Sequence, residues 1–411
     1  MNFTLKTYIA QNGERFSLMF GPDEPGVPLI YPCAFISRRE RGNSTHHTQV
    51  TILSGIQRLK EWERDRKIDL EERLTRGELM TTFEIDNLAA HVRSRRNAKK
   101  GEVVSSRKFN DYWSSICKYI GWLADELMPN RNSANVRKLV EDQTSRLAQK
   151  TRKRAESKAR KHQRILDEKI SDLGRAQLLV LFGEPFKDFK TTINASSYSH
   201  AEKGVRFRNI IMLRILYETG MRRGELLSLK LKSFVEASGG DGAYLSIERN
   251  HDDELDRRAN QPVAKTLGRD VSISAELEAQ IFEYITQYRA ELNNVGLTEE
   301  SFIFCVHRTG KSQGNAISVN GFNSALGQIK EKYPVLSKCH PHAFRHDWNY
   351  RFSLKADELG MSESEEVEAR EQQMGWVPGS TMAKIYNQRH RREKAMAIGR
   401  KIAEDTVRPR K

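Results

Sequence analysis

The stretch Cys-His-Pro-His-Ala-Phe-Arg-His occupies residues 339–346 and is the most informative part of the sequence for fold and function. His342 and Arg345 are three residues apart, so on a helix they share one face. A guanidinium offers a planar pair of donors to the two non-bridging oxygens of a phosphate, and a nearby imidazole moves a proton near neutral pH. His346 falls about 100° further round the same helix, which indicates a packing or supporting residue.

Two short motifs follow this stretch toward the C-terminus. Gln-Gln-Met-Gly-Trp ends at Trp376, and Ile-Tyr-Asn places Tyr386 ten residues later. A tyrosine near the end of a chain is ordinarily a half-buried aromatic residue. In the company of a histidine and an arginine it becomes a candidate nucleophile. Tyr350, on the helix that carries Arg345, is interpreted as a core residue.

An upstream motif, Thr-Gly-Met-Arg-Arg-Gly-Glu-Leu, occupies residues 219–226. Gly220 is well placed to end one helix in a left-handed cap, and Arg222 opens the next helix. Glu225 lies three residues further on and can hold Arg222 in place. Taken alone, this pair would be an ordinary surface ion pair. Combined with the C-terminal motifs, it completes a set of side chains suited to holding a phosphodiester while a tyrosine attacks it.

The four motifs, in this order, resemble those of the tyrosine recombinase (phage integrase) family over roughly residues 175–400. The resemblance implies that Arg222 and Arg345 are the two catalytic arginines, His342 is the catalytic histidine and Tyr386 is the nucleophile. Trp376 takes the place of a histidine or tryptophan of the family. The spacing of ten residues from Trp376 to Tyr386 is one longer than usual, and the extra residue falls in 377–380.

The resemblance also implies a catalytic lysine in a β-hairpin turn. Lys265, in Ala-Lys-Thr-Leu-Gly-Arg, takes the equivalent place. The flanking segments 262–266 and 269–273 predict a hairpin about Leu267-Gly268. Nearby basic side chains compete for the same role, namely those of Arg257, Arg258 and Arg269.

By the same resemblance, the chain is expected to be a site-specific DNA recombinase or integrase that cuts and rejoins DNA through a 3′-phosphotyrosyl intermediate. It would move or resolve a mobile element, as a homotetramer on two double-stranded DNA sites, with accessory recombination proteins as possible partners. The basic tail after Tyr386 would dock on a neighbouring subunit. This chemistry needs no cofactor and no metal. Alternatives are a type IB topoisomerase-like enzyme, a hairpin-forming resolvase and a catalytically silent DNA-binding regulator.

Composition fits a polyanionic partner. The chain has 411 residues, a formal net charge of +15, and 30% charged against 38% apolar residues. Its length predicts two or three domains, and its excess of cations favours nucleic acid. Four widely spaced cysteines contain no Cys-x-x-Cys pair, which argues against a cysteine zinc site and for a reducing compartment.

Neither a signal peptide nor an apolar run of the roughly 20 residues that span a bilayer is evident. These features predict no membrane association. They favour a cytoplasmic, nucleoid-associated protein of prokaryotic, phage or mobile-element origin.

Periodicity and charge divide the chain into four parts. Residues 1–42 read as an N-terminal extension of strands and turns, a possible arm or partner-binding segment. Apolar residues at helical spacing predict a helical core-binding domain over 43–145. A basic linker helix is expected over 146–171, and a catalytic domain with its C-terminal tail over 172–411. The linker's candidate DNA-binding residues are Arg152, Lys153, Arg154, Lys158, Arg160 and Lys161.

The expected fold is therefore mostly α-helical with a small antiparallel β-sheet. It combines a helical N-terminal DNA-binding domain with a mixed α/β catalytic domain. By resemblance to the family, the two domains form a clamp around DNA.

Overall fold

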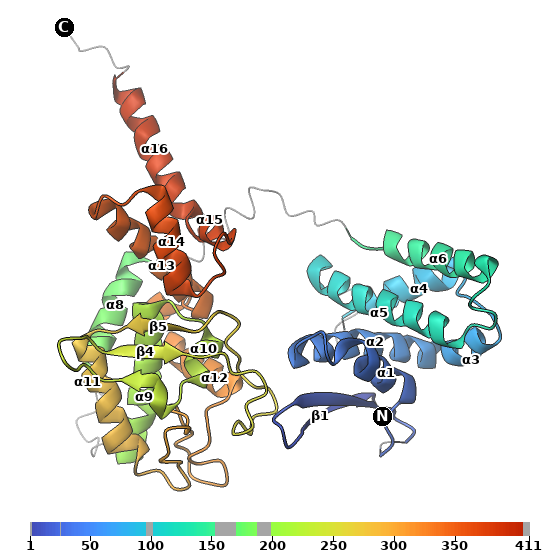
Figure 1. The fold of residues 1–411 in the computed structure, drawn as a ribbon, viewed down its shortest axis with the longest axis horizontal. Coiled ribbons are helices and arrows are strands. Elements are labelled where there is room, and N and C mark those ends of the chain that lie inside the picture. Colours follow the sequence, from blue (N-terminus) through green and yellow to red (C-terminus); the bar gives the residue numbers. More distant parts are fainter. Residues whose placement is uncertain (1, 25, 96–101, 153–169, 187–198, 406–411) are drawn as a thin grey trace. The chain divides into compact units, whose positions relative to one another are not determined.

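The computed structural model describes residues 2–24, 26–95, 102–152, 170–186 and 199–405. The chain divides into two compact units, Met1–Glu156 and Ser157–Lys411 (Figure 1). Both units are mainly helical, and each carries a small antiparallel sheet. The predicted fold class is confirmed. No helix in the described ranges is long and apolar enough to cross a membrane.

The N-terminal unit opens with a hairpin of β1 (Thr4–Ile9) and β2 (Arg15–Phe20), paired in antiparallel register. Helix α1 (Ile30–Phe35) and the π-helical turn η1 (Ile36–Glu40) follow. The predicted strands thus occur over the first 20 residues, whereas 30–40 are helical. The helix tolerates Pro32 because this residue lies in its first turn, where the backbone N–H groups have no acceptor within the helix. Pro32, Phe35 and Ile36 are buried there.

Five helices complete this unit, and their apolar faces form one core. Apolar spacing in the sequence predicts three helices here, one from about His46, one over 82–95 and one over 109–127, and α2, α4 and α5 confirm them. Gly55 of α2 lies so close to α5 that an added Cβ would approach the backbone oxygen of Tyr112 to 2.9 Å. The helices are α2 (His46–Arg66), α3 (Leu70–Thr75), α4 (Thr82–Arg93), α5 (Ser106–Leu127) and α6 (Ala134–Gln149).

The predicted basic linker begins within α6, which ends at Gln149, and residues 150–152 are not helical. The backbone of Arg152 pairs with the side chain of Asn110 through bonds of 2.9 and 3.0 Å. Its guanidinium lies 5.6 Å from the centre of the Phe109 ring. Five of the candidate DNA-binding residues lie outside the described residues: Lys153, Arg154, Lys158, Arg160 and Lys161.

The C-terminal unit is built around the buried helix α9 (His200–Thr219), on which a three-stranded sheet and several helices pack (Figure 1). In the same figure the C-terminal half of α16 extends away from the rest of the unit. The remaining elements are α8 (Asp172–Gly183), α10 (Arg223–Ser228), η2 (Leu231–Ser233), β3 (Phe234–Val235), β4 (Tyr244–Ile247), β5 (Arg269–Ser272), α11 (Ala275–Glu283), η3 (Tyr284–Arg289), α12 (Val319–Lys332), η4 (Pro334–Leu336), α13 (Pro341–Glu358), α14 (Glu363–Met374), α15 (Met382–Tyr386) and α16 (Gln388–Asp405).

The sheet has the order β3-β4-β5, and all its strands are antiparallel. The predicted hairpin about Leu267-Gly268 is wrong, because β5 pairs with β4 and residues 248–268 form a long connection between them. Two backbone N–H groups of the expected first strand and turn are used elsewhere. That of Ala264 donates to the side chain of Asn250, and that of Leu267 donates to the carbonyl of Gly375.

Candidate active site

The motif at 219–226 meets the motif at 339–346 where α9 ends. Gly220 caps α9 with φ of +63°, a left-handed conformation that glycine adopts without strain. Its carbonyl accepts a hydrogen bond of 2.9 Å from Arg345 on α13. A Cβ at this position would lie 2.8 Å from the Trp348 ring. The glycine therefore lets the end of α9 approach α13 closely enough to hold Arg345.

Arg345 is fully buried but only partly hydrogen-bonded. Besides the bond to Gly220, one terminal nitrogen is 3.5 Å from the carbonyl of Met374, and the Nε has no acceptor among the described residues. Burial, and next the charge of Arg222, lower the pKa of Arg345 to about 10. The group is still a cation at neutral pH. A buried cation with an unused donor is suited to receive an anion.

Glu225 connects Arg222 to the rest of the site. Its fully buried carboxylate accepts from the Arg222 backbone at 2.8 Å, from the Thr266 hydroxyl at 2.5 Å and from Arg269 at 2.9 Å. The Arg222 side chain lies 3.4 Å away. Burial by itself raises the pKa of Glu225, but Arg269 and the hydrogen bonds outweigh it and hold the pKa at about 2. The carboxylate is therefore ionised and links two separate segments of chain.

Lys265 lies in the long connection between β4 and β5, immediately before Thr266. Its side chain is exposed, while the Leu267 N–H bonds the Gly375 carbonyl at 3.0 Å. The backbone around Lys265 is thus held between α10 and the turn that precedes Trp376. Of the competing basic residues, Arg258 and Arg269 are engaged in ion pairs, and Arg257 is exposed like Lys265.

Tyr386 is the last residue of the short helix α15, and 8% of its surface is exposed. Its ring stacks on Trp376 with centroids 5.3 Å apart, and the Arg345 guanidinium lies 5.6 Å from its centre. The indole Nε1 of Trp376 is buried with no acceptor in the described part of the chain. Nucleophile candidate, arginine and tryptophan therefore form one cluster.

His342 and His346, both in the 339–346 motif, occupy different environments. His346 packs against Tyr386, with ring centroids 4.6 Å apart and planes inclined by 36°. His342, one turn earlier on α13, is exposed. The two residues are four apart, so their side chains lie on the same face of α13, one turn from each other. It is His346 rather than His342 that packs directly on the tyrosine.

The sequence reasoning missed a buried polar network below Tyr386. The Ser353 hydroxyl lies 2.7 Å from Glu366 and 2.9 Å from Asn387, and it accepts from Arg370 at 2.6 Å. Asn387 directly follows Tyr386 in sequence. That adjacency and the four-residue spacing of Glu366 and Arg370 were the local signals. The network itself joins α13, α14 and the residue between α15 and α16.

Tyr350 is half-buried rather than a core residue. Its hydroxyl donates to Glu393 at 2.5 Å and so connects α13 to α16. Within the described ranges, no group of three or more histidine, cysteine, aspartate or glutamate residues is arranged to hold a metal ion.

Known proteins resemble this chain in their sequence pattern and in their fold. A model of the phage integrase family matches residues 187–392. Among solved structures, a pre-cleavage complex of XerH site-specific recombinase with its difH substrate is similar, with a TM-score of 0.51 and 15% identity, covering 86% of this chain and 80% of that one. A post-cleavage complex of XerH with palindromic difH gives 0.50 and 16%, covering 87% and 81%. No curated protein matches the chain significantly in sequence.

The family model places this chain in the tyrosine recombinase class of enzymes. By its match over half its length, the chain belongs to the phage integrase family.

Proposed function

We propose that this chain is a site-specific DNA recombinase that cleaves and rejoins DNA through a 3′-phosphotyrosyl intermediate and thereby moves or resolves a mobile element. The observation that carries the proposal is the contact of Tyr386 with both Trp376 and the buried Arg345. Arg345 is 41 residues before Tyr386 and Trp376 is ten residues before it, yet both contact the one tyrosine.

The reaction follows from the residue types. The Tyr386 oxygen attacks the scissile phosphorus, a P–O bond to the tyrosine forms, and the P–O5′ bond breaks. The phenol must lose its proton in this step. We assign that proton to His342, and Lys265 protonates the leaving O5′. Attack by a 5′-hydroxyl of a second strand reverses each step, so exchange needs no external energy source.

Charge develops on the two non-bridging oxygens during this step. Arg222 and Arg345 supply two positive charges, and such preorganised donors lower barriers by several kcal/mol. The Nε of Arg345 and the Nε1 of Trp376 are buried donors that lack acceptors among the described residues. A phosphate oxygen is the acceptor that best suits both.

The packing of His346 on Tyr386 supports a second assignment for the phenolic proton. Replacing His342 or His346 by Gln separates the two assignments. Of the two replacements, that of the histidine which accepts the proton should lower the rate of covalent-complex formation more.

Double-stranded DNA with specific sites is the proposed substrate, gripped between the two units, with a homotetramer assembling on two such sites. Accessory recombination proteins are possible additional partners. The first turns of α16 are held by its own unit, through His390 at 2.7 Å and Lys394 at 2.6 Å from Asp357 and through the hydrogen bond from Tyr350 to Glu393. Further along, Met396, Ile398 and Ile402 are exposed.

We propose that this distal half of α16 docks on a neighbouring subunit. A chain ending after Ala395 keeps the Asp357 contacts and loses the exposed half. Light scattering should then show DNA-bound complexes smaller than tetramers. Tetramers of normal stability would disprove the docking.

Covalent trapping tests the proposed reaction. Labelled DNA from the ends of the element that carries this gene, nicked so that religation fails, is mixed with wild type, Tyr386→Phe and the matched control Tyr350→Phe. Wild type and the control should give a covalent complex on a denaturing gel, and Tyr386→Phe should give none. A complex from Tyr386→Phe would refute the assignment.

The same variants separate the alternative functions. A type IB topoisomerase-like enzyme would relax supercoiled plasmids that lack the site. A hairpin-forming resolvase would leave covalently closed DNA ends. A catalytically silent regulator would bind DNA, give no covalent complex, and be indifferent to Tyr386→Phe.

A further inference from the structure

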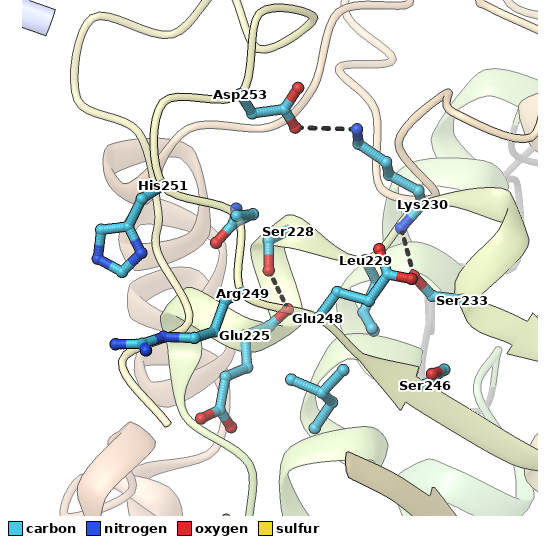
Figure 2. A pocket seen from close by; sticks show the side chains of 12 residues that line it. Glu225, Ser228, Leu229, Lys230, Ser233, Ser246, Glu248, Arg249, His251 and Asp253 are labelled. Carbon is cyan, nitrogen blue, oxygen red and sulfur yellow. Dashed lines mark hydrogen bonds and ion pairs between the residues drawn. The ribbon is translucent and has the colours of Figure 1, made fainter. Parts of the chain in front are cut away.

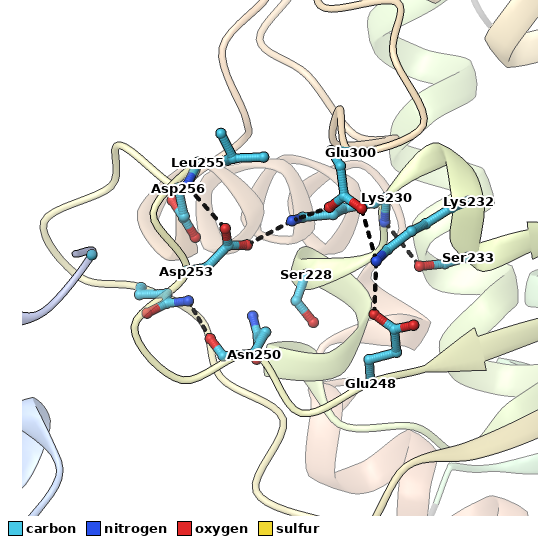
Figure 3. Close-up of polar contacts among 12 residues, drawn as sticks. Ser228, Lys230, Lys232, Ser233, Glu248, Asn250, Asp253, Leu255, Asp256 and Glu300 are labelled. Carbon is cyan, nitrogen blue, oxygen red and sulfur yellow. Dashed lines mark hydrogen bonds and ion pairs between the residues drawn. The ribbon is translucent and has the colours of Figure 1, made fainter. Parts of the chain in front are cut away.

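The connection 248–268, which carries Lys265, is held in place at several points. At its start, Lys230 lies 2.9 Å from Asp253 and 2.8 Å from Glu300 (Figure 3). Lys232 lies 3.1 Å from Glu248 and 2.9 Å from the same Glu300. Two lysines and three carboxylates thus fasten the first limb of the connection, residues 248–253, to the turn after α10.

The middle of the connection is fastened through Arg258. Its guanidinium bonds both oxygens of the buried Asp256, at 2.9 and 2.7 Å. It also donates to the carbonyls of Leu227 and Ile317, at 3.0 and 2.8 Å. Arg258 therefore ties the middle of the connection to Leu227 and Ile317. Residues 259–268, the return limb, follow it in the chain.

One side chain joins the return limb to the first limb. The Asn250 Oδ1 accepts from the backbone N–H of Ala264 at 2.9 Å, and its Nδ2 donates to the carbonyl of Pro262 at 3.0 Å. The Asn250 carbonyl in turn accepts from the Gln261 side chain. An N–H on one side and a carbonyl on the other determine which way the amide points. Both partners lie within three residues of Lys265.

Packing alone does not hold this region. A cavity of about 210 Å³ lies beside the first limb, lined among others by Asn250, Ser228 and Asp253 (Figure 2). On that side the first limb is held by its ion pairs rather than by packing. On the return limb, Val263 lies against α10, where a Cβ on Gly224 would come within 2.5 Å of its carbonyl oxygen. The hydrogen bonds of Asn250 connect the first limb to this return limb, which is packed near Arg222.

We propose that Asn250 is a positioning residue for Lys265: it fixes the backbone at Pro262 and Ala264, so that the exposed lysine is directed at the leaving oxygen. The inference rests on the proposed function, in which Lys265 donates that proton. Thr266, bonded to Glu225, holds the other side of Lys265. Asn250 itself does not touch the DNA in this proposal.

A substrate that needs no acid provides the test. In a 5′-bridging phosphorothiolate, sulfur replaces O5′, so cleavage breaks a P–S bond and the thiolate leaves without a proton. Asn250→Ala should bind DNA normally and cleave the ordinary phosphodiester about 10- to 100-fold more slowly, since a general acid contributes about 100- to 10,000-fold. On the sulfur substrate its rate should return to that of wild type. Asn293→Ala, at an exposed asparagine of another loop, should match wild type on both.

Lys265→Ala distinguishes the two levels of the proposal. It should lose more activity than Asn250→Ala on the phosphodiester and recover on the sulfur substrate. If Lys265→Ala recovers and Asn250→Ala is equally slow on both substrates, or unaffected on both, the positioning role is refuted while the acid role stands. If Lys265→Ala does not recover, the acid role is refuted and the role of Asn250 is refuted with it.

Discussion

Replacing Glu225 by Gln keeps the shape of the side chain and removes the charge that joins Arg222, Thr266 and Arg269. Glutamine would leave the Arg269 guanidinium, 4% exposed, without its anionic partner. Removing one member of a buried ion pair costs about 3–5 kcal/mol. We therefore expect this variant to destabilise the C-terminal unit strongly.

The pKa of Glu225 leads to a similar magnitude. A fall from the ordinary value of 4.5 to about 2 corresponds to about 3 kcal/mol of extra stability in the folded unit. Because the folded-state pKa is depressed, this stability is complete above about pH 4.5 and is lost as the pH falls toward about 2. The difference between wild type and Glu225→Gln should therefore be about 3 kcal/mol at pH 7 and shrink in acid.

Hydrogen exchange in increasing urea measures this for one unit at a time. Peptides from α9 report the opening free energy of the C-terminal unit, and peptides from α5 serve as an internal reference in the same chain. Glu248→Gln is the matched control, since Glu248 is 62% exposed in its ion pair and should cost less than about 1 kcal/mol. A loss below about 1 kcal/mol for Glu225→Gln, or a difference that does not change with pH, would refute the reasoning.

Three further predictions concern the cluster around Tyr386. Trp376→Phe keeps a ring for stacking and loses the buried N–H donor, so single-turnover cleavage should fall about 100-fold with little change in unfolding free energy; an unchanged rate would contradict this role. In Arg345→Lys the single ammonium group cannot bond the Gly220 carbonyl and a phosphate together, as the planar guanidinium can. The yield of covalent complex should therefore fall at least about 100-fold, while DNA binding in gel shifts is largely kept. Ser353→Ala removes the hydroxyl shared by the network below Tyr386, which should cost about 1–3 kcal/mol in urea unfolding; a loss of under about 0.5 kcal/mol would show that the hydroxyl contributes little.

Local patterns in the sequence were sufficient for much of the helical framework. The apolar spacing correctly indicated α2 and α5, and the glycine at 220 ended α9 in the left-handed cap that its motif predicted. These features depend on residues within a few positions of each other. The predicted ion pair between Arg222 and Glu225 is local in the same sense, because the two residues are three positions apart, and the structure contains it.

Features that depend on distant partners were not predictable in this way. The residues Leu267-Gly268 suit a tight turn, but the hairpin predicted there does not form. Strand β5 pairs instead with β4, on the far side of the long connection. Asn250 gave no signal, because its partners are backbone groups that any residue could supply. His346 was placed by helical spacing alone, which cannot show that α15 brings Tyr386 over that side of α13.

The buried donors of Arg345 and Trp376 lack acceptors in the part of the chain that the structure describes, and we expect this to affect the lifetime of the protein. Such unmet groups weaken the folded state until something binds them, and a ligand that binds only the folded state stabilises it by mass action. Cognate DNA would then protect the C-terminal unit against heat and proteases, while molecules without a site unfold and are degraded sooner. The number of target sites in a cell would help to set how much of the enzyme persists there.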